Sequence, residues 1–384
     1  MAMPTPASKV AFVFPGQGSQ KVGMGRALHD AYPEARAVFG EADDVLGYPL
    51  SKLCFDGPEA ELTLTANAQP AILTTSVAAL RVLEARSPVR PVAVAGHSLG
   101  EYSALVAAGA LRLADAVRLV HMRGKFMQDA VPAGVGAMAA IIGLSADDVA
   151  AACSEAAGAE VVSPANLNGG GQVVIAGHKD AVDRACAAAK TRGAKRVIPL
   201  TVSAPFHCAL MQPAADRLAS ELARVEVKAP GVPVISNVEA KPNQDAARVK
   251  DLLARQVTAP VRWEESVQCL AGLGVDSVVE VGAGTVLGGL VRRIAPDLSV
   301  HAAGDPASIE ALAHGLADRK GRARDRRLAR HRPRHRRRAR WSRREGRAEL
   351  HQQRGGRHRG GGGGRRGGRH GSDQAVRRLG FRGR

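Results

Sequence analysis

The stretch Val92-Ala93-Val94-Ala95-Gly96-His97-Ser98-Leu99-Gly100-Glu101 decides the fold. Residues 91–95 are apolar, partly β-branched and followed by a glycine, which predicts a buried strand. Residues 101–109 are rich in Ala and Leu and lack Pro, which predicts a helix. The G-x-S-x-G between them is typical of a sharp strand-to-helix turn that exposes a serine at the end of a sheet. Such pentapeptides also arise by chance, but the flanking strand and helix favour the interpretation of Ser98 as a nucleophile.

The charge of the chain is distributed unevenly. Residues 319–384 hold 26 Lys or Arg and only 4 Asp or Glu, whereas the preceding residues hold 28 and 32. The two parts therefore carry formal net charges of +22 and −4. The basic character belongs to the tail, so it says nothing about the partners of the globular part.

Cysteine content and hydropathy limit the class of protein. The five cysteines are widely spaced and include no C-x-x-C pair, so neither a zinc site nor a disulfide framework is indicated, and no metal or other cofactor is expected. The N-terminal apolar run is too short for a signal peptide, and no run approaches the ~18 residues of a membrane span. We expect a soluble, cytoplasmic protein.

A second glycine-rich turn lies near the N-terminus. Residues 10–14 predict a strand that leads into Pro15-Gly16-Gln17-Gly18-Ser19-Gln20. A phosphate-binding loop is an alternative, but no Gly-Lys-Ser/Thr follows. Gln17 could donate a hydrogen bond into a site beside Ser98, or the segment could be a plain turn.

Residues 134–203 predict a separate unit. Strands at 138–142, 160–166, 172–176 and 196–203 alternate with helices at 145–157 and 180–192, in the β-α-β-β-α-β order of a ferredoxin-like fold. We therefore predict an α/β protein with an α/β-hydrolase-like domain built on a parallel sheet, formed by residues 8–133 and 204–317. The ferredoxin-like subdomain is inserted between these two parts.

The best candidate for a general base is His207. It lies in Ser203-Ala204-Pro205-Phe206-His207-Cys208, after a predicted strand and before a helix expected to reach Val225. Histidine is suited to accept a serine proton near neutral pH. Other predicted helices cover 69–84, 114–130 and 257–270. Arg123 lies on the second of these, where a single arginine is usually a solvated surface residue.

Taken together, these motifs resemble those of the malonyl-CoA:acyl carrier protein transacylases of bacterial fatty-acid synthesis. The resemblance spans residues 11–313. It depends on a set of segments in order: F-P-G-Q-G-S-Q, G-H-S-L-G-E, Met122-Arg123-Gly124, Ala165-Asn166, Gln172 to Gly177, F-H-C-A-L-M, Ser236-Asn237-Val238, Gln256 before Val261-Arg262-Trp263, and Glu280-Val281-Gly282.

The resemblance implies a malonyl transfer that passes through an acyl-serine. Ser98 would carry the malonyl group from malonyl-CoA, and His207, oriented by the carbonyl of Gln256 in place of an aspartate, would be its base. The thiol of acyl carrier protein would then take the group. The other implied roles are an oxyanion hole of the Gln17 and Leu99 amides, a carboxylate clamp at Arg123, and substrate contacts at His97 and Asn166.

Two further expectations concern partners. Lys195 and Arg196 follow the second helix of the inserted unit, and we expect them near the site, where they would dock the acidic carrier protein. A serine hydrolase of α/β-hydrolase type is the alternative enzyme. It predicts an acidic partner for the histidine and no need for Arg123.

The tail, residues 318–384, predicts disorder because it is rich in Arg, Gly and His and poor in large aliphatic residues. A nucleic-acid-binding arm is one alternative, through non-specific phosphate contacts. Aromatic side chains are nearly absent, however, and Lys320 is its single lysine. GC-rich DNA read out of frame has this composition, so we favour a frameshifted or read-through extension.

Overall fold

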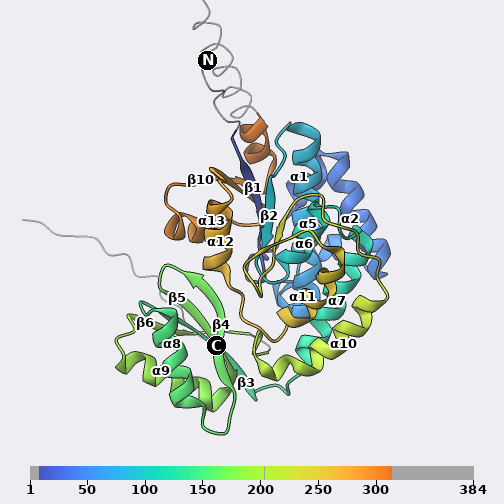
Figure 1. The fold of residues 1–384 in the computed structure, drawn as a ribbon. Helices are drawn as coiled ribbons and strands as arrows, with labels where there is room; N and C mark the ends of the chain where they lie inside the picture. The colour runs from blue at the N-terminus through green and yellow to red at the C-terminus, as the bar shows by residue number, and fades with distance from the viewer. Residues whose placement is uncertain (1–7, 203, 314–384) are drawn as a thin grey trace, which may run out of the picture. The chain divides into compact units, whose positions relative to one another are not determined.

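The computed structural model describes residues 8–202 and 204–313. The predicted disordered tail lies outside the described residues. Two sheets organise the described part (Figure 1). The larger has six strands in the order β10-β9-β1-β2-β7-β8, and β8 alone is antiparallel to its neighbour. Its strands are β1 (Val10–Phe14), β2 (Ala93–Gly96), β7 (Val234–Ile235), β8 (Pro242–Asn243), β9 (Ser277–Val281) and β10 (Ser299–Ala303).

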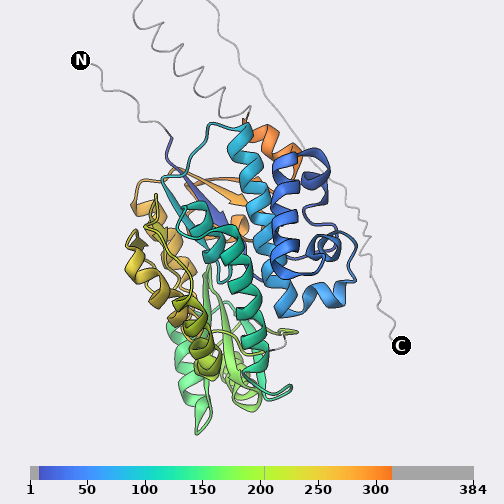
Figure 2. The same cartoon turned by 90° about the vertical axis from the view of Figure 1, so that its right-hand side faces the viewer.

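Helices cover both faces of the larger sheet (Figures 1 and 2). Val10, Phe12 and Phe14 of β1 pack toward α2, α5 and α7, whereas Ala11 and Val13 pack toward α12 and α13. Burial on both faces explains why the central strands are continuous apolar runs. The helices of this part are α1 (Arg26–Ala31), α2 (Pro33–Leu46), α3 (Leu50–Asp56), α4 (Glu59–Thr63), α5 (Thr65–Arg86), α6 (Gly100–Ala107), α7 (Leu113–Asp129), α10 (Gln212–Ala223), α11 (Ala246–Gln256), α12 (Trp263–Gly272) and α13 (Val286–Ile294).

The second sheet is antiparallel and has the strand order β4-β5-β3-β6. Ala139 and Ile141 face its two helices, whereas Met138 and Ala140 join the core of the larger part. The helix and strand order expected for this segment is present. Its elements are β3 (Gly136–Ile142), α8 (Ala146–Ala157), β4 (Val162–Gly169), β5 (Gln172–His178), α9 (Lys179–Thr191) and β6 (Arg196–Pro199).

The helix predicted at 257–270 is wrong at its N-terminal end, because α12 begins at Trp263. Proline at position 260 has no amide hydrogen and disfavours helix in the residue before it. Residues 257–259 form a turn, and Val261 pairs with β4: Val261 N donates to Ala165 O at 2.9 Å, and Leu167 N donates to Val261 O at 2.9 Å. This pairing joins β4 to the larger part of the molecule.

Other boundaries also differ from the sequence prediction. The strand predicted at 196–203 ends at Pro199, and the helix expected from His207 to Val225 is a short 3₁₀ turn, Ala209–Met211, followed by α10. Helix α11 and strand β10 were not predicted. No helix of the described residues is long and apolar enough to cross a membrane.

Candidate active site

The turn after β2 forces Ser98 into an uncommon backbone conformation. Its φ is 52°, in the left-handed region that non-glycine residues seldom occupy. The flanking glycines have no room for a side chain: a Cβ at Gly96 would lie 1.9 Å from the Gly100 carbonyl oxygen, and one at Gly100 would lie 2.2 Å from the Phe14 oxygen. The close approach of the turn to itself therefore requires Gly96, and its packing against β1 requires Gly100.

Asn237, which follows β7, holds the turn from the neighbouring strand. Ser98 N donates to Asn237 Oδ1 at 2.7 Å, and Asn237 Nδ2 donates to Gly96 O at 2.7 Å. Both bonds are made across the sheet. They constrain the backbone on either side of His97 and stabilise the conformation of Ser98.

Ser98 and His207 form a hydrogen-bonded pair. Ser98 Oγ lies 2.7 Å from His207 Nε2, and His207 Nδ1 lies 2.8 Å from the backbone oxygen of Gln256. A carbonyl oxygen only accepts, so Nδ1 carries the hydrogen and Nε2 is free to accept the serine proton. No carboxylate of the described residues forms a hydrogen bond with His207. A serine hydrolase with the usual catalytic triad requires such an acidic partner, so this alternative is contradicted.

Burial keeps His207 in its neutral form. The side chain is 3% exposed. Burial, reinforced by the nearby Arg123 guanidinium, lowers the pKa of His207 to about 3. The imidazole is therefore an unprotonated base throughout the physiological range.

Arg123 is a buried residue, contrary to the default expectation for a lone arginine on an amphipathic helix. It is 1% exposed, and α7 directs it at the serine: Nη2 donates to Ser98 Oγ at 3.0 Å. Two side-chain amides accept its other bonds, Gln69 Oε1 at 2.7 Å and Gln256 Oε1 at 2.9 Å. None of the described carboxylates forms an ion pair with Arg123. A buried cation with neutral partners favours the binding of an anion.

Glu101, in the first turn of α6, accepts two hydrogen bonds at one oxygen. Gln256 Nε2 donates to its Oε2 at 2.7 Å and Asn237 N donates at 3.1 Å. The residue is 3% exposed. Burial raises the pKa of Glu101 to about 7, although both hydrogen bonds and Arg123 act in the opposite direction. This acid thus lies beside the site without contacting the histidine.

The backbone amides of Gln17 and Leu99 have no acceptor among the described residues. They belong to loops in contact, since a Cβ at Gly16 would lie 2.4 Å from the oxygen of His97. The Gln17 side chain is turned toward α5 and donates to Thr65 Oγ1 at 3.2 Å. Its amide hydrogen, rather than its side chain, is therefore the group available beside Ser98.

His97 connects the two sheets. Its Nε2 lies 2.9 Å from Asn168 Oδ1 on β4, and its ring centroid lies 5.5 Å from that of Trp263. Asn166 is 8% exposed and its backbone forms a β-bridge with Val261. The asparagine side chain that reaches the serine loop is therefore Asn168, which the sequence analysis did not select.

Lys195 and Arg196 are not brought into this group of side chains. Both are exposed. Arg196 begins β6, the edge strand farthest in the sheet from β4, which carries Asn166 and Asn168. Neither residue has an ion-pair partner in the described part of the chain.

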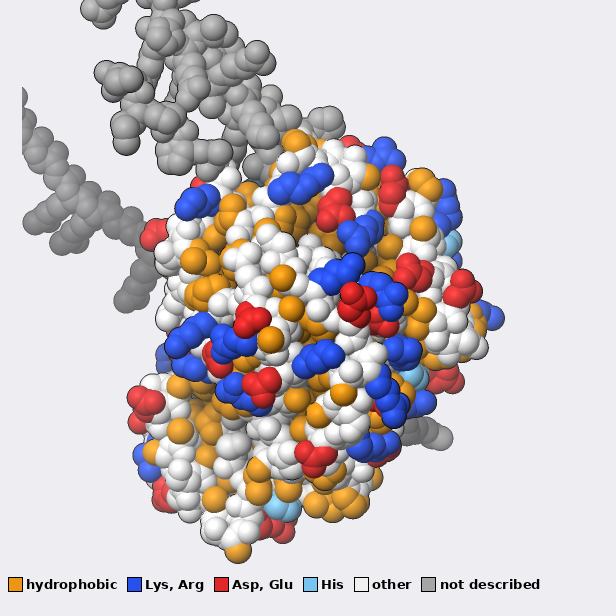
Figure 3. All heavy atoms as spheres, turned by 45° about the vertical axis from the view of Figure 1, so that its right-hand side comes forward, with side chains coloured by type: hydrophobic (Ala, Val, Ile, Leu, Met, Phe, Trp, Pro, Cys, Tyr) orange, Lys and Arg blue, Asp and Glu red, His pale blue; other side chains and the backbone are white. Residues whose placement is uncertain are grey.

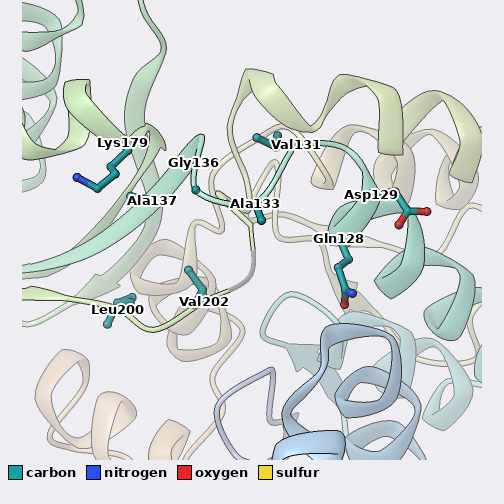
Figure 4. A pocket seen from close by; sticks show the side chains of 10 residues that line it. Gln128, Asp129, Val131, Ala133, Gly136, Ala137, Lys179, Leu200 and Val202 are labelled. Atoms are coloured by element: carbon teal, nitrogen blue, oxygen red, sulfur yellow. The ribbon is translucent and has the colours of Figure 1, made fainter.

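A cavity of about 530 Å³ lies elsewhere, between the C-terminal end of α7 and the start of β3 (Figure 4). Gln128 projects into it from α7, and Lys179, Leu200 and Val202 line its other sides. None of Ser98, His207 and Arg123 lines it. The described residues contain no group of three or more His, Cys, Asp and Glu side chains that could hold a metal ion.

The structure brings together seven of the residues selected from the sequence: Gln17, His97, Ser98, Leu99, Arg123, His207 and Gln256. Four members of the site were missed as functional residues: Gln69, Glu101, Asn168 and Asn237. Glu101 and Asn237 stand inside motifs that the sequence analysis quoted, but no local signal indicated their partners.

Comparison with known proteins identifies relatives over the described part. A family model described as an acyl transferase domain matches residues 11–305. A Salmonella typhimurium protein named malonyl CoA-acyl carrier protein transacylase is 55% identical over 304 residues, which cover 79% of this chain and 98% of that protein.

Solved structures agree with this similarity. An acyl carrier protein S-malonyltransferase from Vibrio cholerae has a TM-score of 0.78 at 52% identity, covering 79% of this chain and 100% of that one. A malonyl-transacylase solved in complex with a type II PKS acyl-carrier protein has a TM-score of 0.79 at 50% identity, covering 80% and 100%.

Proposed function

Because the chain belongs to the family of malonyl CoA-acyl carrier protein transacylases, we propose that it transfers a malonyl group from malonyl-CoA to the phosphopantetheine thiol of acyl carrier protein. The product supplies fatty-acid elongation. One observation carries the proposal: a buried guanidinium and an imidazole are both bonded to the same serine oxygen. The pair combines a base for acyl transfer with a binding site for an acyl group that ends in a carboxylate.

The first half-reaction forms an acyl-serine. Ser98 Oγ attacks the thioester carbonyl of malonyl-CoA while His207 Nε2 accepts its proton. The amides of Gln17 and Leu99, which lack acceptors among the described residues, donate to the oxyanion of the tetrahedral intermediate. Collapse breaks the carbon–sulfur bond, and the His207 proton passes to the departing thiolate.

The second half-reaction reverses these roles. The phosphopantetheine thiol gives its proton to His207 and attacks the malonyl-serine carbonyl. The ester bond breaks, Ser98 recovers its proton from His207, and malonyl-acyl carrier protein leaves. The order of events is therefore ping-pong, and the intermediate is covalent.

Arg123 provides selectivity for malonyl over acetyl thioesters. It donates to Ser98 Oγ at 3.0 Å, so a carboxylate on an acyl group attached to that oxygen lies within its reach. A guanidinium binds both carboxylate oxygens and compensates a buried negative charge. His97 and Asn166 are proposed as contacts for the rest of the substrate, and Lys195 and Arg196 as a docking site for the carrier protein.

The test is intact-protein mass spectrometry after incubation with malonyl-CoA. Wild-type protein should gain one malonyl group at Ser98 and lose it when holo-acyl carrier protein is added. Ser98→Ala should gain none, and His207→Ala should acylate at least ~10²-fold more slowly. Labelling of Ser98→Ala would contradict the proposal. If the malonyl group were instead transferred to water, and the carrier protein gained none, the protein would be a hydrolase.

A further inference from the structure

The side chain of Gln256 makes contacts that its role at His207 does not require. Its backbone oxygen bonds His207, whereas its side-chain Oε1 accepts from Arg123 Nη2 and its Nε2 donates to Glu101 Oε2. Nε2 also donates to the backbone oxygen of Ser98 at 3.0 Å. One residue thus connects the base, the cation and the serine, and its side chain lies between Glu101 and Arg123.

The chemistry of these partners permits only one orientation of the Gln256 amide. A guanidinium only donates, so it must face the oxygen of the amide. A carboxylate and a backbone carbonyl accept, so they must face the NH₂ group. Without the acceptor at Glu101, the Gln256 amide would be held less firmly against rotation. A rotated amide would turn its NH₂ group toward the guanidinium of Arg123, which also only donates. The guanidinium would then lose its hydrogen bond to Gln256.

From this arrangement we propose that Glu101 is a positioning residue. It holds the Gln256 amide with its oxygen toward Arg123, and thereby holds the guanidinium at Ser98, where the carboxylate of the acyl group is bound. The inference rests on the proposed function, because it assigns Glu101 to the malonyl selectivity of the same site. The Glu101 side chain forms no hydrogen bond with Ser98 Oγ or His207, so its effect on the acyl group passes through Gln256 and Arg123.

A purely structural role makes a different prediction. Glu101 lies in the first turn of α6, where a negatively charged side chain interacts favourably with the helix dipole. It also accepts a hydrogen bond from Asn237 N. Loss of those contacts would destabilise the serine turn and slow malonyl and acetyl transfer by the same factor. Loss of Arg123 positioning would slow malonyl transfer selectively. The ratio of kcat/KM for the two CoA esters therefore separates the roles.

Two substitutions isolate the hydrogen-bond acceptor. Both donors to Glu101 reach the same oxygen, Oε2, so Glu101→Gln can present its carbonyl oxygen in that place. Glu101→Met has similar length and no comparable acceptor. Glu280→Met is the matched control. Glu280 is 1% exposed and likewise accepts two hydrogen bonds, from Leu287 N and Gly288 N, but its side chain is not bonded to Gln256 or Arg123.

The experiment measures acylation of Ser98 by malonyl-CoA and by acetyl-CoA on the full chain. Glu101→Met should lower the malonyl-to-acetyl ratio by at least ~10-fold, the loss expected for a hydrogen bond to a charged group. Glu101→Gln should keep the ratio within about threefold of wild type, and Glu280→Met should leave it unchanged. Arg123→Ala sets the ratio expected when the guanidinium is absent.

Gln256→Met is the second variant, for the case in which Glu101→Met does not fold. It removes the amide and keeps the backbone oxygen at His207, so it should lower the ratio as Glu101→Met does. A wild-type ratio in Glu101→Met or Gln256→Met would overturn the inference, as would a loss in Glu101→Gln equal to that in Glu101→Met. If wild-type protein were not acylated at Ser98, the proposed function would fail instead.

Discussion

At the scale of single residues, burial sets the protonation of the site in two opposite ways. It lowers the pKa of His207 to about 3 and raises the pKa of Glu101 to about 7, because in each case it disfavours the charged form. Arg123 stays charged, since its ordinary pKa lies far above neutrality. In the resting site, Arg123 is therefore positively charged and His207 is a neutral base.

The lowered pKa of His207 predicts unusual tolerance of acid. A histidine with a pKa of 6.5 would be mostly protonated at pH 5, and acylation would slow by about 30-fold. Since the pKa of His207 is lowered, its neutral form persists as pH falls, and single-turnover acylation by malonyl-CoA should remain within about threefold of its pH 7.5 rate. Rapid-quench mass spectrometry from pH 5 to 8 measures this.

The same pH profile in Glu101→Gln is the control, because that variant removes the carboxyl whose pKa is raised to about 7. Circular dichroism at each pH verifies that the protein is folded. A titration with its midpoint near 6.5 in both proteins would show that His207 is not held neutral by burial.

At the scale of elements, the turn between β2 and α6 depends on close packing against β1. Its serine has a φ of 52°, and Gly100 lies against the backbone of Phe14, which cannot move without displacing a central strand. The predicted strand, turn and helix are all present there. Farther along the chain the prediction was poorer, because Pro260 interrupts a segment with helical composition and leaves it to pair with β4.

Gly100→Ala tests this packing. The added Cβ would lie 2.2 Å from the Phe14 oxygen, so the turn or the strand must shift. We expect the free energy of unfolding to fall by about 2 kcal/mol and acylation of Ser98 to be lost at least ~10²-fold. Urea denaturation and acyl-enzyme formation measure the two effects.

Gly40→Ala is the matched control. Gly40 lies within α2, and a Cβ there would meet nothing within 4 Å. It should stabilise the protein or leave it unchanged, because alanine favours helix more than glycine does. Equal behaviour of the two variants would argue against the packing explanation.

At the scale of the whole molecule, the site forms where the two sheets meet. The larger sheet supplies Ser98, and β4 of the smaller sheet reaches the serine loop through Asn168 and pairs with Val261. The division into residues 8–133, 134–203 and 204–317, and the likeness of the larger part to α/β-hydrolases, stay predictions. On the face in Figure 3, basic and acidic side chains are intermixed, so a carrier protein bound to that face would meet a local group of cations rather than a broad basic patch.

Lys195 and Arg196 are exposed and unpaired within the described part, which suits them to a local docking contact. Lys195→Glu combined with Arg196→Glu should raise the KM for acyl carrier protein about three- to tenfold and leave the KM for malonyl-CoA unchanged. Lys228→Glu combined with Lys241→Glu is the matched control, since both lysines are exposed. Equal changes for the two substrates, or for the two double variants, would count against docking.

The sequence alone determined what depends on neighbouring residues. Glycine spacing, a β-branched run and an alanine-rich segment predicted the strand, the serine turn and the helix, because backbone conformation there is governed by local sterics. The tertiary structure decided the rest. An arginine on an amphipathic helix is usually exposed, and Arg123 becomes a buried cation only because α7 packs beside α5. The hydrogen bond between Glu101 and Gln256 joins residues that lie 155 positions apart in the sequence. Such contacts arise from the packing of elements and have no local signature, so the burial of Arg123 and its support by Gln256 and Glu101 are visible only in the folded chain.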